Sequence, residues 1–169
     1  MFTSESILNG KMPNVRVGIG TGTDRGFVEK SVRVMGNKNV TVYKDPVRLV
    51  DDLLSGAIDA AVRGDMSSSK VMHILKDEFA VEQLERTVLL EPNHGKLIFL
   101  APVGIDEGWT VDKKFDIVVR SVALMEKLGA DTRIGVMSGG RKEDLGRNPT
   151  VDRTIEDAEE LVKKLTAAG

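Results

Sequence analysis

Short β-branched runs alternate with stretches of helical periodicity through the first half of this 169-residue sequence. The runs at 15–20, 40–43 and 58–62 are apolar, and each precedes apolar residues spaced three and four positions apart. Strands that alternate with helices form βαβ units, in which the strands run parallel. The alternation therefore predicts an α/β fold with a mostly parallel sheet.

The sequence after residue 85 departs from this alternation. Two apolar runs, 87–90 and 96–101, are separated only by Glu91–Gly95, whose composition is that of a turn. Two strands joined this directly pair antiparallel, because a parallel pair needs a crossover connection. We therefore expect one antiparallel pair beside the parallel strands.

Two helices and one more strand are expected in the remainder. Apolar residues over 115–125 recur at helical spacing, and Gly129 is typical of a helix stop. The run 133–137 is predicted to be a buried strand, and the last helix is expected to start near Thr150. At the other end of the chain, the sequence is compatible with a short helix over 4–10.

The length of 169 residues suits a single α/β domain, residues 1–169, with a sizeable core. The sequence ends on Gly169, directly after the last predicted helix. A domain can be complete when it stops on a helix. A terminal glycine is also typical of a C-cap with another strand to follow, which would make this chain truncated at its C-terminus.

Composition excludes several classes of function. The net charge of −2 gives no indication of bulk nucleic-acid or membrane binding. The absence of cysteine excludes disulfides, thiolate metal sites and a cysteine nucleophile, and the histidines His73 and His94 lie on different predicted elements, so no metal site is predicted. No apolar run reaches transmembrane length and no signal-peptide pattern is present, so we expect a cytoplasmic protein.

The loop after the first strand carries closely spaced glycines, in the pattern Gly18-x-Gly20-x-Gly22. This pattern is similar to a phosphate loop, although it is not GxGxxG and lacks the Walker lysine. Gly20, Thr21 and Gly22 are candidate ligand contacts. The alternative is that the glycines only permit a tight strand-to-helix turn, with Thr23 or Asp24 capping the helix in either case.

The loop after the third strand combines positive charge with hydroxyl groups. Arg63 and Gly64 end the strand, and Ser67, Ser68, Ser69 and Lys70 open the next helix. Free N–H groups and the helix dipole favour a phosphate or carboxylate at such a helix start. The alternative is an ordinary serine-capped helix on a surface loop.

The stretch 136–147 is the third glycine-rich strand exit. Its candidate ligand contacts are a hydroxyl, two adjacent glycines and two arginines, namely Ser138, Gly139, Gly140, Arg141 and Arg147. Ligands of open α/β sheets bind at the carboxyl ends of strands, and arginine can hold an anion through two parallel hydrogen bonds. The stretch therefore predicts an anion-binding loop.

The loop 102–110 offers less specific signals. Trp109 either packs this loop onto the following helix, which we favour, or stacks on a ligand. Asp106 and Glu107 could serve as acid or base, but solvated loop carboxylates are the usual case.

Two known families resemble these motifs. The run Leu54–Gly64 with the serines that follow it, and the segment 98–165, resemble the phosphate acetyl- and butyryltransferases. A closer resemblance, on Arg63-Gly64 with Ser67–Lys70 and on Ser138–Arg147, is to the methanogenesis marker family described as a methyltransferase-related subunit X. This second similarity covers nearly the whole chain.

The resemblance implies a three-layer α/β/α fold of the isocitrate/isopropylmalate-dehydrogenase type, which is also phosphotransacetylase-like. It implies a methanogenic archaeon as the source and a transferase by descent. The chain departs from the acyltransferases, because it lacks their downstream motif that holds phosphate and acyl-CoA. It also carries no defensible S-adenosylmethionine motif or histidine-containing cobalamin signature, so the cofactor is unknown.

Two hypotheses about function follow. The chain is either a transferase, acting on a small phosphorylated, acyl or methyl-carrying substrate held by Arg63 and Arg141, or a non-catalytic subunit. Such a subunit would sense an anionic metabolite such as phosphate, acyl phosphate or a CoA-like molecule, or would dock on a methyltransferase complex. The absence of an evident nucleophile–base pair favours the subunit, and a retained fold without ligand is a third possibility. By analogy with the fold, a homodimer is also expected.

Overall fold

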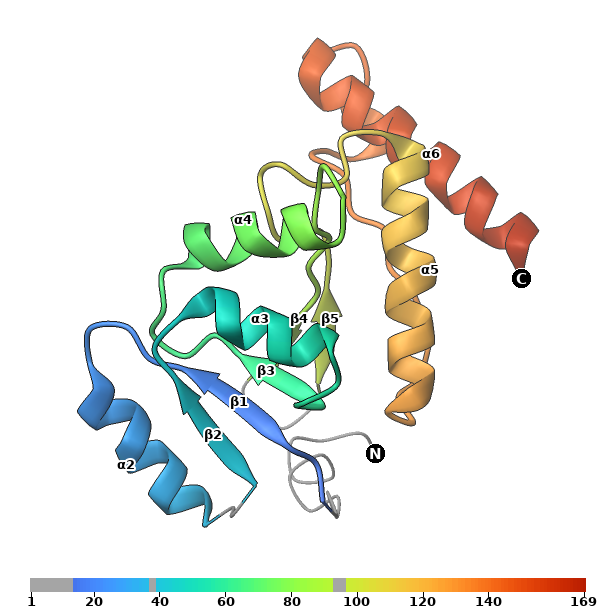
Figure 1. Ribbon diagram of the computed structural model, residues 1–169. Coiled ribbons are helices and arrows are strands. Elements are labelled where there is room, and N and C mark those ends of the chain that lie inside the picture. The colour runs from blue at the N-terminus through green and yellow to red at the C-terminus, as the bar shows by residue number, and fades with distance from the viewer. Residues whose placement is uncertain (1–13, 37–38, 93–96) are drawn as a thin grey trace. The chain divides into compact units, whose positions relative to one another are not determined.

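The computed structural model describes residues 14–36, 39–92 and 97–169 (Figure 1). These residues group into two compact units, an N-terminal unit up to residue 84 and a C-terminal unit from residue 85. The helix expected over 4–10 lies outside the described residues. No helix of the described ranges has the length and apolarity needed to cross a membrane.

The N-terminal unit is built on a parallel three-stranded sheet, as the alternation predicts. Strands β1 (Val17–Gly20), β2 (Val40–Tyr43) and β3 (Ala60–Val62) lie in the order β2-β1-β3, and β1 pairs in parallel with both neighbours. The chain therefore leaves β1 in one direction to form β2 and returns across β1 to form β3. Right-handed crossovers in opposite directions place their helices on opposite faces of a sheet.

The helices of this unit begin where local sequence signals predict. Asp24 caps α2 (Arg25–Met35) by accepting a hydrogen bond from the N–H of Phe27, and Gly36 ends that helix in the left-handed conformation. Asp45 caps α3 (Pro46–Leu54), with Pro46 at its first position. Helix α3 packs on β1 and β3, and α4 (Ser68–Glu78) packs on α3 (Figure 1).

The core of the N-terminal unit lies between α3, α4 and the sheet. It contains the buried side chains Tyr43, Leu49, Ile58, Met66 and Val71. Leu49 and Val50 are the most buried residues of α3, with exposed fractions of 1% and 2%. Leu49 therefore faces the sheet, whereas Val47 and Leu54 are exposed.

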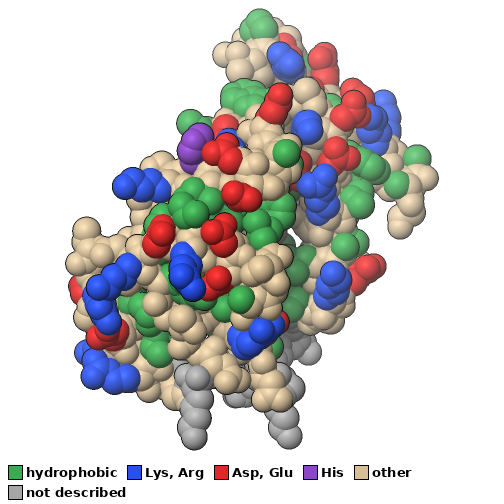
Figure 2. Space-filling model, viewed as in Figure 1, with side chains coloured by type: hydrophobic (Ala, Val, Ile, Leu, Met, Phe, Trp, Pro, Cys, Tyr) green, Lys and Arg blue, Asp and Glu red, His purple; other side chains and the backbone are tan. Residues whose placement is uncertain are grey.

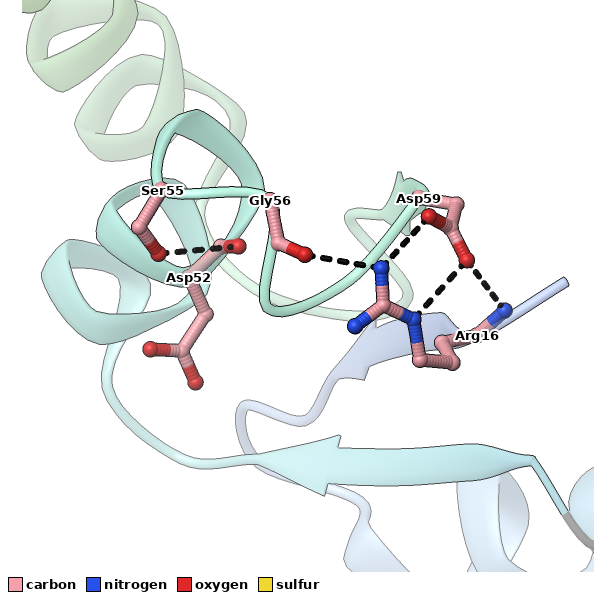
Figure 3. A network of polar contacts seen from close by, with 5 residues as sticks. All are labelled: Arg16, Asp52, Ser55, Gly56 and Asp59. Carbon is pink, nitrogen blue, oxygen red and sulfur yellow. Dashed lines mark hydrogen bonds and ion pairs between the residues drawn. The ribbon is translucent and has the colours of Figure 1, made fainter.

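An arginine–aspartate pair joins the starts of β1 and β3 (Figure 3). The Arg16 guanidinium donates from Nε to Asp59 Oδ2 at 3.0 Å and from Nη2 to Asp59 Oδ1 at 2.7 Å. Its Nη2 also donates to the carbonyl of Gly56 at 2.7 Å, and the backbone N–H of Arg16 donates to Asp59 Oδ2 at 2.8 Å. These hydrogen bonds from the Arg16 side chain and backbone lower the pKa of Asp59 to about 2. The pair fixes the register of the two strands at the edge opposite to the predicted ligand loops.

The C-terminal unit contains the predicted antiparallel pair. Strands β4 (Val88–Leu90) and β5 (Ile98–Leu100) pair antiparallel, with Leu89 opposite Phe99. The predicted antiparallel direction is confirmed, and it follows from the short connection between the two strands. Part of that connection, 93–96, including His94, lies outside the described residues.

Two long helices complete this unit. Helix α5 (Val111–Lys127) is capped by Thr110 and followed by Gly129 in the left-handed conformation, as predicted. Helix α6 (Pro149–Ala168) starts after Asn148, whose side chain accepts hydrogen bonds from two backbone N–H groups. The two helices pack on each other, and Lys114 of α5 forms an ion pair of 2.8 Å with Asp157 of α6.

The predicted buried strand at 133–137 is wrong. These residues form no strand, and Ile134 and Met137 are 46% and 81% exposed. A β-strand exists only through hydrogen bonds to a neighbouring strand, and no described strand pairs with this segment. Its apolar pattern is compatible with a strand, but the described residues supply no partner.

Candidate functional site

The loops after β1 and β3 lie side by side in the N-terminal unit. Parallel pairing of the two strands, with Ile19 opposite Val62, brings their carboxyl ends to the same edge of the sheet. This edge is also the point at which the chain direction reverses, since β2 and β3 lie on opposite sides of β1. Crevices at such switch points are where open α/β sheets bind ligands. The fold therefore brings together Gly20, Thr21, Gly22, Arg63, Gly64, Ser67, Ser68 and Ser69.

Glycine at positions 20 and 64 allows these two loops to touch. A Cβ on Gly20 would lie 2.5 Å from the carbonyl oxygen of Arg63, and one on Gly64 would lie 2.0 Å from the carbonyl oxygen of Gly20. Gly64 also has a positive φ of 58°. The close approach of the two backbones therefore requires glycine, which supports the structural interpretation of these two residues.

Asp65 fills the turn between β1 and α2 with a carboxylate. The N–H of Gly22 donates to Asp65 Oδ1 at 2.6 Å, and the N–H of Asp24 donates to Asp65 Oδ2 at 2.7 Å. These backbone hydrogen bonds from Asp24 and Gly22 lower the pKa of Asp65. The glycine-containing turn thus binds an anionic group, and that group belongs to the same chain.

Asp65 is absent from the residues predicted from the sequence. The only available signal was an acidic residue at a strand exit that otherwise carries arginine and serines. Its partners lie more than forty positions earlier in the sequence, so local pattern does not connect them.

Thr21 contributes a buried hydroxyl at the same strand exit. Its residue is 3% exposed, and its N–H donates to the carbonyl of Tyr43 at 2.7 Å. Within the described part of the chain, no hydrogen-bond partner is found for its Oγ1. Because buried hydroxyls in proteins are nearly always hydrogen-bonded, this atom has an unused capacity for a ligand group or a water molecule.

The side chains of Arg63, Ser67 and Ser69 make hydrogen bonds within the β3–α4 segment itself. The guanidinium of Arg63 donates from Nη1 to the carbonyl of Met66. The hydroxyl groups of Ser67 and Ser69 lie 3.0 Å apart, within hydrogen-bonding distance. Ser67 occupies the N-cap position of α4, but its side chain makes no capping hydrogen bond, so the predicted serine cap is wrong in that detail.

The third predicted loop, 138–147, belongs to the C-terminal unit and has its own internal hydrogen bonds. Ser138 Oγ donates to the carbonyl of Gly140 at 2.7 Å, and the N–H of Gly139 donates to Thr154 Oγ1 at 2.9 Å. Lys142 forms an ion pair of 3.0 Å with Glu159 of α6, and the N–H of Gly146 donates to Asp152 Oδ1 at 3.0 Å.

Asp144 lies between the two predicted arginines of this loop, at the end of the short 3₁₀ helix η1 (Lys142–Asp144). Arg147 Nη1 donates to Asp144 Oδ1 at 2.9 Å, and Arg141 Nε lies 3.6 Å from Asp144 Oδ2. The Arg141 and Arg147 side chains are nevertheless 82% and 73% exposed. An internal carboxylate therefore accompanies both candidate anion loops.

Glu107 is not the solvated carboxylate that the sequence suggests. Its residue is 6% exposed, and Arg86 donates to it from Nε and, at 3.3 Å, from its backbone N–H. Burial alone would raise the pKa of Glu107, but hydrogen bonds from the Arg86 side chain and from backbone N–H groups outweigh it, so the pKa lies below its ordinary value. Glu107 is therefore a structural anchor of the 102–110 loop.

Two other aromatic or titratable candidates lie at the surface. Trp109 is 69% exposed, so it does not pack the loop onto α5 as favoured above. His73 is exposed on α4 and lies 3.4 Å from Asp77. Within the described ranges, no group of three or more His, Asp or Glu side chains could hold a metal ion.

Comparison with known proteins identifies relatives in methanogenic archaea. The chain is 37% identical over 127 residues to a Methanosarcina mazei protein named "Putative methyltransferase mtx subunit X", and 36% identical over 138 residues to the Methanosarcina acetivorans protein of that name. It is 35% identical over 152 residues to an uncharacterized methyltransferase of Methanocaldococcus jannaschii. The matched regions cover 75%, 81% and 86% of this chain and 45%, 49% and 62% of those proteins. The chain thus spans about half the length of the curated relatives it matches.

These matches confirm the resemblance to the subunit X family. No protein-family model matches the chain, and no solved structure gives a significant match. The more distant resemblance to phosphate acetyl- and butyryltransferases therefore stays a prediction.

Proposed function

The chain is a relative of methanogen proteins named as methyltransferases and as mtx subunit X, and on this basis we propose a methyltransferase-related role that depends on binding a small anionic or phosphorylated ligand. The ligand site we propose is the switch point of the N-terminal unit, at the loops after β1 and β3. The loop of the C-terminal unit with Ser138, Gly139, Gly140, Arg141 and Arg147 is a separate candidate anion-binding site.

One observation carries this proposal. The N–H groups of Gly22 and Asp24 converge on the two oxygens of a single carboxylate, that of Asp65. Two convergent backbone donors at the start of a helix are the usual receptor for a carboxylate or phosphate. A ligand anion would use the same donors after Asp65 rotates away, and Thr21 Oγ1 and Arg63 would lie at the same strand exits.

If the chain is a transferase, its chemistry would rest on positioning and electrostatic stabilisation. Arg63 would balance charge on the transferred group, and the hydroxyl groups of Ser67–Ser69 would donate hydrogen bonds. The substrate would be an acyl phosphate, a CoA-like molecule or a methyl carrier.

A non-catalytic, ligand-binding or regulatory subunit of a methyltransferase complex is the second candidate. It is favoured by the hydrogen bonds of the candidate serines. Ser67 and Ser69 lie within reach of each other, and Ser138 donates to a carbonyl, so these hydroxyls are not held by a general base. The names of the two Methanosarcina relatives, which include the word subunit, also support it.

The finer structural predictions accompany this proposal. We propose a three-layer α/β/α arrangement of the isocitrate/isopropylmalate-dehydrogenase type, in a single domain. A cytoplasmic location and a homodimer stay predictions from the sequence. A crystal structure of the chain would test the layering, and light scattering would test the dimer.

Titration calorimetry with inorganic phosphate and acetyl phosphate tests the ligand site. Asp65→Asn removes the internal charge while keeping the side-chain shape, so it should bind these anions about tenfold more tightly than the wild type, since an ionic hydrogen bond contributes about 1.5–3 kcal/mol. Asp59→Asn is the matched control, because it removes another hydrogen-bonded aspartate at the opposite edge of the same sheet.

The outcomes separate the possibilities clearly. If the wild type binds the anion and Asp65→Asn binds it with the same affinity, the anion binds at this site but not at the two N–H groups that Asp65 occupies. Absence of binding to all three proteins would reject the ligand proposal. A thermal-shift panel with coenzyme A, acetyl-CoA, S-adenosylmethionine and a methylated pterin then identifies the ligand class, and turnover by the isolated chain would reject the non-catalytic role.

A further inference from the structure

A hollow between β2 and α3 is separate from the two candidate anion loops. Its volume is about 320 Å³, at the lower end of the roughly 300–1,000 Å³ that is usual for small-molecule sites. All of its lining residues lie between positions 41 and 52 of the N-terminal unit. The hollow is therefore formed by a single strand-to-helix segment, on an outer strand of the described sheet.

Charged side chains of both signs line this hollow. Asp45, Arg48 and Asp52 are spaced three and four positions apart, so they lie along one side of α3. Figure 2 shows positive and negative side chains close together over α3, and in Figure 3 the Asp52 carboxylate points away from the Arg16–Asp59 pair. Asp52 is therefore available to the hollow and takes no part in fixing the strand register.

The two carboxylates of the hollow each accept one hydrogen bond from the protein. Asp52 Oδ2 accepts from the hydroxyl of Tyr43 at 2.7 Å, and Asp45 Oδ1 accepts from the N–H of Val47 at 3.0 Å. An ionised carboxylate has about four acceptor sites. Both carboxylates therefore retain the capacity to accept hydrogen bonds from the hydroxyl groups of a ligand.

The two cations of the hollow are held less firmly. Arg48 Nε lies 4.0 Å from Asp52 Oδ2, and the Arg48 side chain is 75% exposed. In the described part of the chain, no hydrogen bond or ion pair neutralises the ammonium group of Lys44. Both cations lie at the start of α3, where the helix dipole favours negative charge. An anion bound in the hollow would therefore compensate an unfavourable arrangement of charge.

We propose that this hollow binds a small phosphorylated sugar. Lys44 and Arg48 hold the phosphate through charge-assisted hydrogen bonds, and the carboxylates of Asp45 and Asp52 accept from the sugar hydroxyls. A simple anion would leave the carboxylates unused, and an uncharged sugar would leave the cations unused. The volume suits a monosaccharide phosphate. This site goes beyond the proposed function, because it uses none of the groups at the β1 and β3 exits.

Titration calorimetry with ribose 5-phosphate tests the proposal. Lys44→Gln and Arg48→Gln should each weaken its binding about tenfold, since each removes a charge-assisted hydrogen bond to the phosphate. Ribose, which lacks the phosphate, should bind the wild type about a hundredfold more weakly. Lys30→Gln is the matched control, because it removes the charge of an exposed lysine on α2 of the same unit.

The variant Asp65→Asn distinguishes this hollow from the switch-point site. It should leave the affinity for ribose 5-phosphate unchanged, whereas it tightens the binding of an anion held by the N–H groups of Gly22 and Asp24. If ribose 5-phosphate binding responds to Asp65→Asn and not to Lys44→Gln or Arg48→Gln, the sugar phosphate binds at the switch point and the hollow is rejected.

Two further results would reject the hollow without affecting the switch-point proposal. They are the absence of ribose 5-phosphate binding and an equal affinity of Lys44→Gln, Arg48→Gln and Lys30→Gln for it. Circular dichroism verifies that the variants fold. If they do not, amide chemical shifts of the wild type decide: shifts within 41–52 on addition of ribose 5-phosphate support the hollow, and shifts confined to other residues reject it.

Discussion

The close contact between the β1 and β3 exits can be tested by adding one methyl group. In Gly64→Ala, the new Cβ would lie 2.0 Å from the carbonyl oxygen of Gly20, whereas ordinary contacts are 3.4–4 Å. The backbone of one loop must therefore move away from the other, and enforced overpacking of this kind costs about 1–3 kcal/mol. The positive φ of Gly64 adds about 1–2 kcal/mol, because an L-residue is strained in the left-handed region.

Gly56→Ala separates these two contributions. Gly56 also has a positive φ, 73°, but no heavy atom lies within 4 Å of the Cβ position. It should therefore lose only the conformational part, about 1–2 kcal/mol. We expect Gly64→Ala to lose about 3 kcal/mol in total, which is more than Gly56→Ala loses.

Urea unfolding measures both free energies, provided that the slope with denaturant is unchanged. Because the contact shapes the proposed ligand site, Gly64→Ala should also weaken phosphate binding, and Gly56→Ala should leave it unchanged. Equal destabilisation by the two substitutions would refute the reasoning, since it would mean that the strand exits do not touch.

Three further predictions concern the packing and charge of each unit. Leu49→Ala should cost about 2–5 kcal/mol of unfolding free energy in urea, because the side chain is 1% exposed and leaves a cavity; a loss below 1 kcal/mol would contradict its place in the core. Arg86→Ala should lower the unfolding free energy by about 2 kcal/mol at pH 7, since it deprives buried Glu107 of its charged partner. This loss is smaller than the about 3–5 kcal/mol usual for breaking a buried ion pair, because the arginine is partly in water. A loss under about 0.5 kcal/mol would show that backbone N–H groups alone stabilise the Glu107 carboxylate. The pKa of Asp59 is lowered from 3.8 to about 2 by Arg16, so its stabilisation is complete above about pH 4 and is lost as the pH falls toward 2. The melting temperature of Asp59→Asn should therefore lie below that of the wild type at pH 7 and converge with it near pH 2, and a constant difference would exclude the ion pair as the cause.

Local sequence signals predicted the element boundaries well. The caps formed by Asp24 and Asp45 could be predicted, because each aspartate and its hydrogen-bond donor are at most three positions apart. The antiparallel direction of β4 and β5 was likewise predictable, since it follows from a short connection. The same holds for the α/β class, which the alternation of strand and helix periodicity indicates.

The sequence therefore determined, by itself, where the helices and all but one of the predicted strands lie. Only the tertiary structure decided which groups these loops contact. The N–H of Gly22 meets Asp65 across 43 positions of sequence, and Glu107 meets Arg86 across 21. Segment 133–137 shows the same limit, because its apolar pattern is that of a strand and it finds no partner among the described residues. The physical reason is that helix capping and hydrophobic periodicity depend on residues close together in the sequence. Strand pairing, the burial of a carboxylate and the choice of acceptor for a backbone N–H depend on segments that only folding brings together.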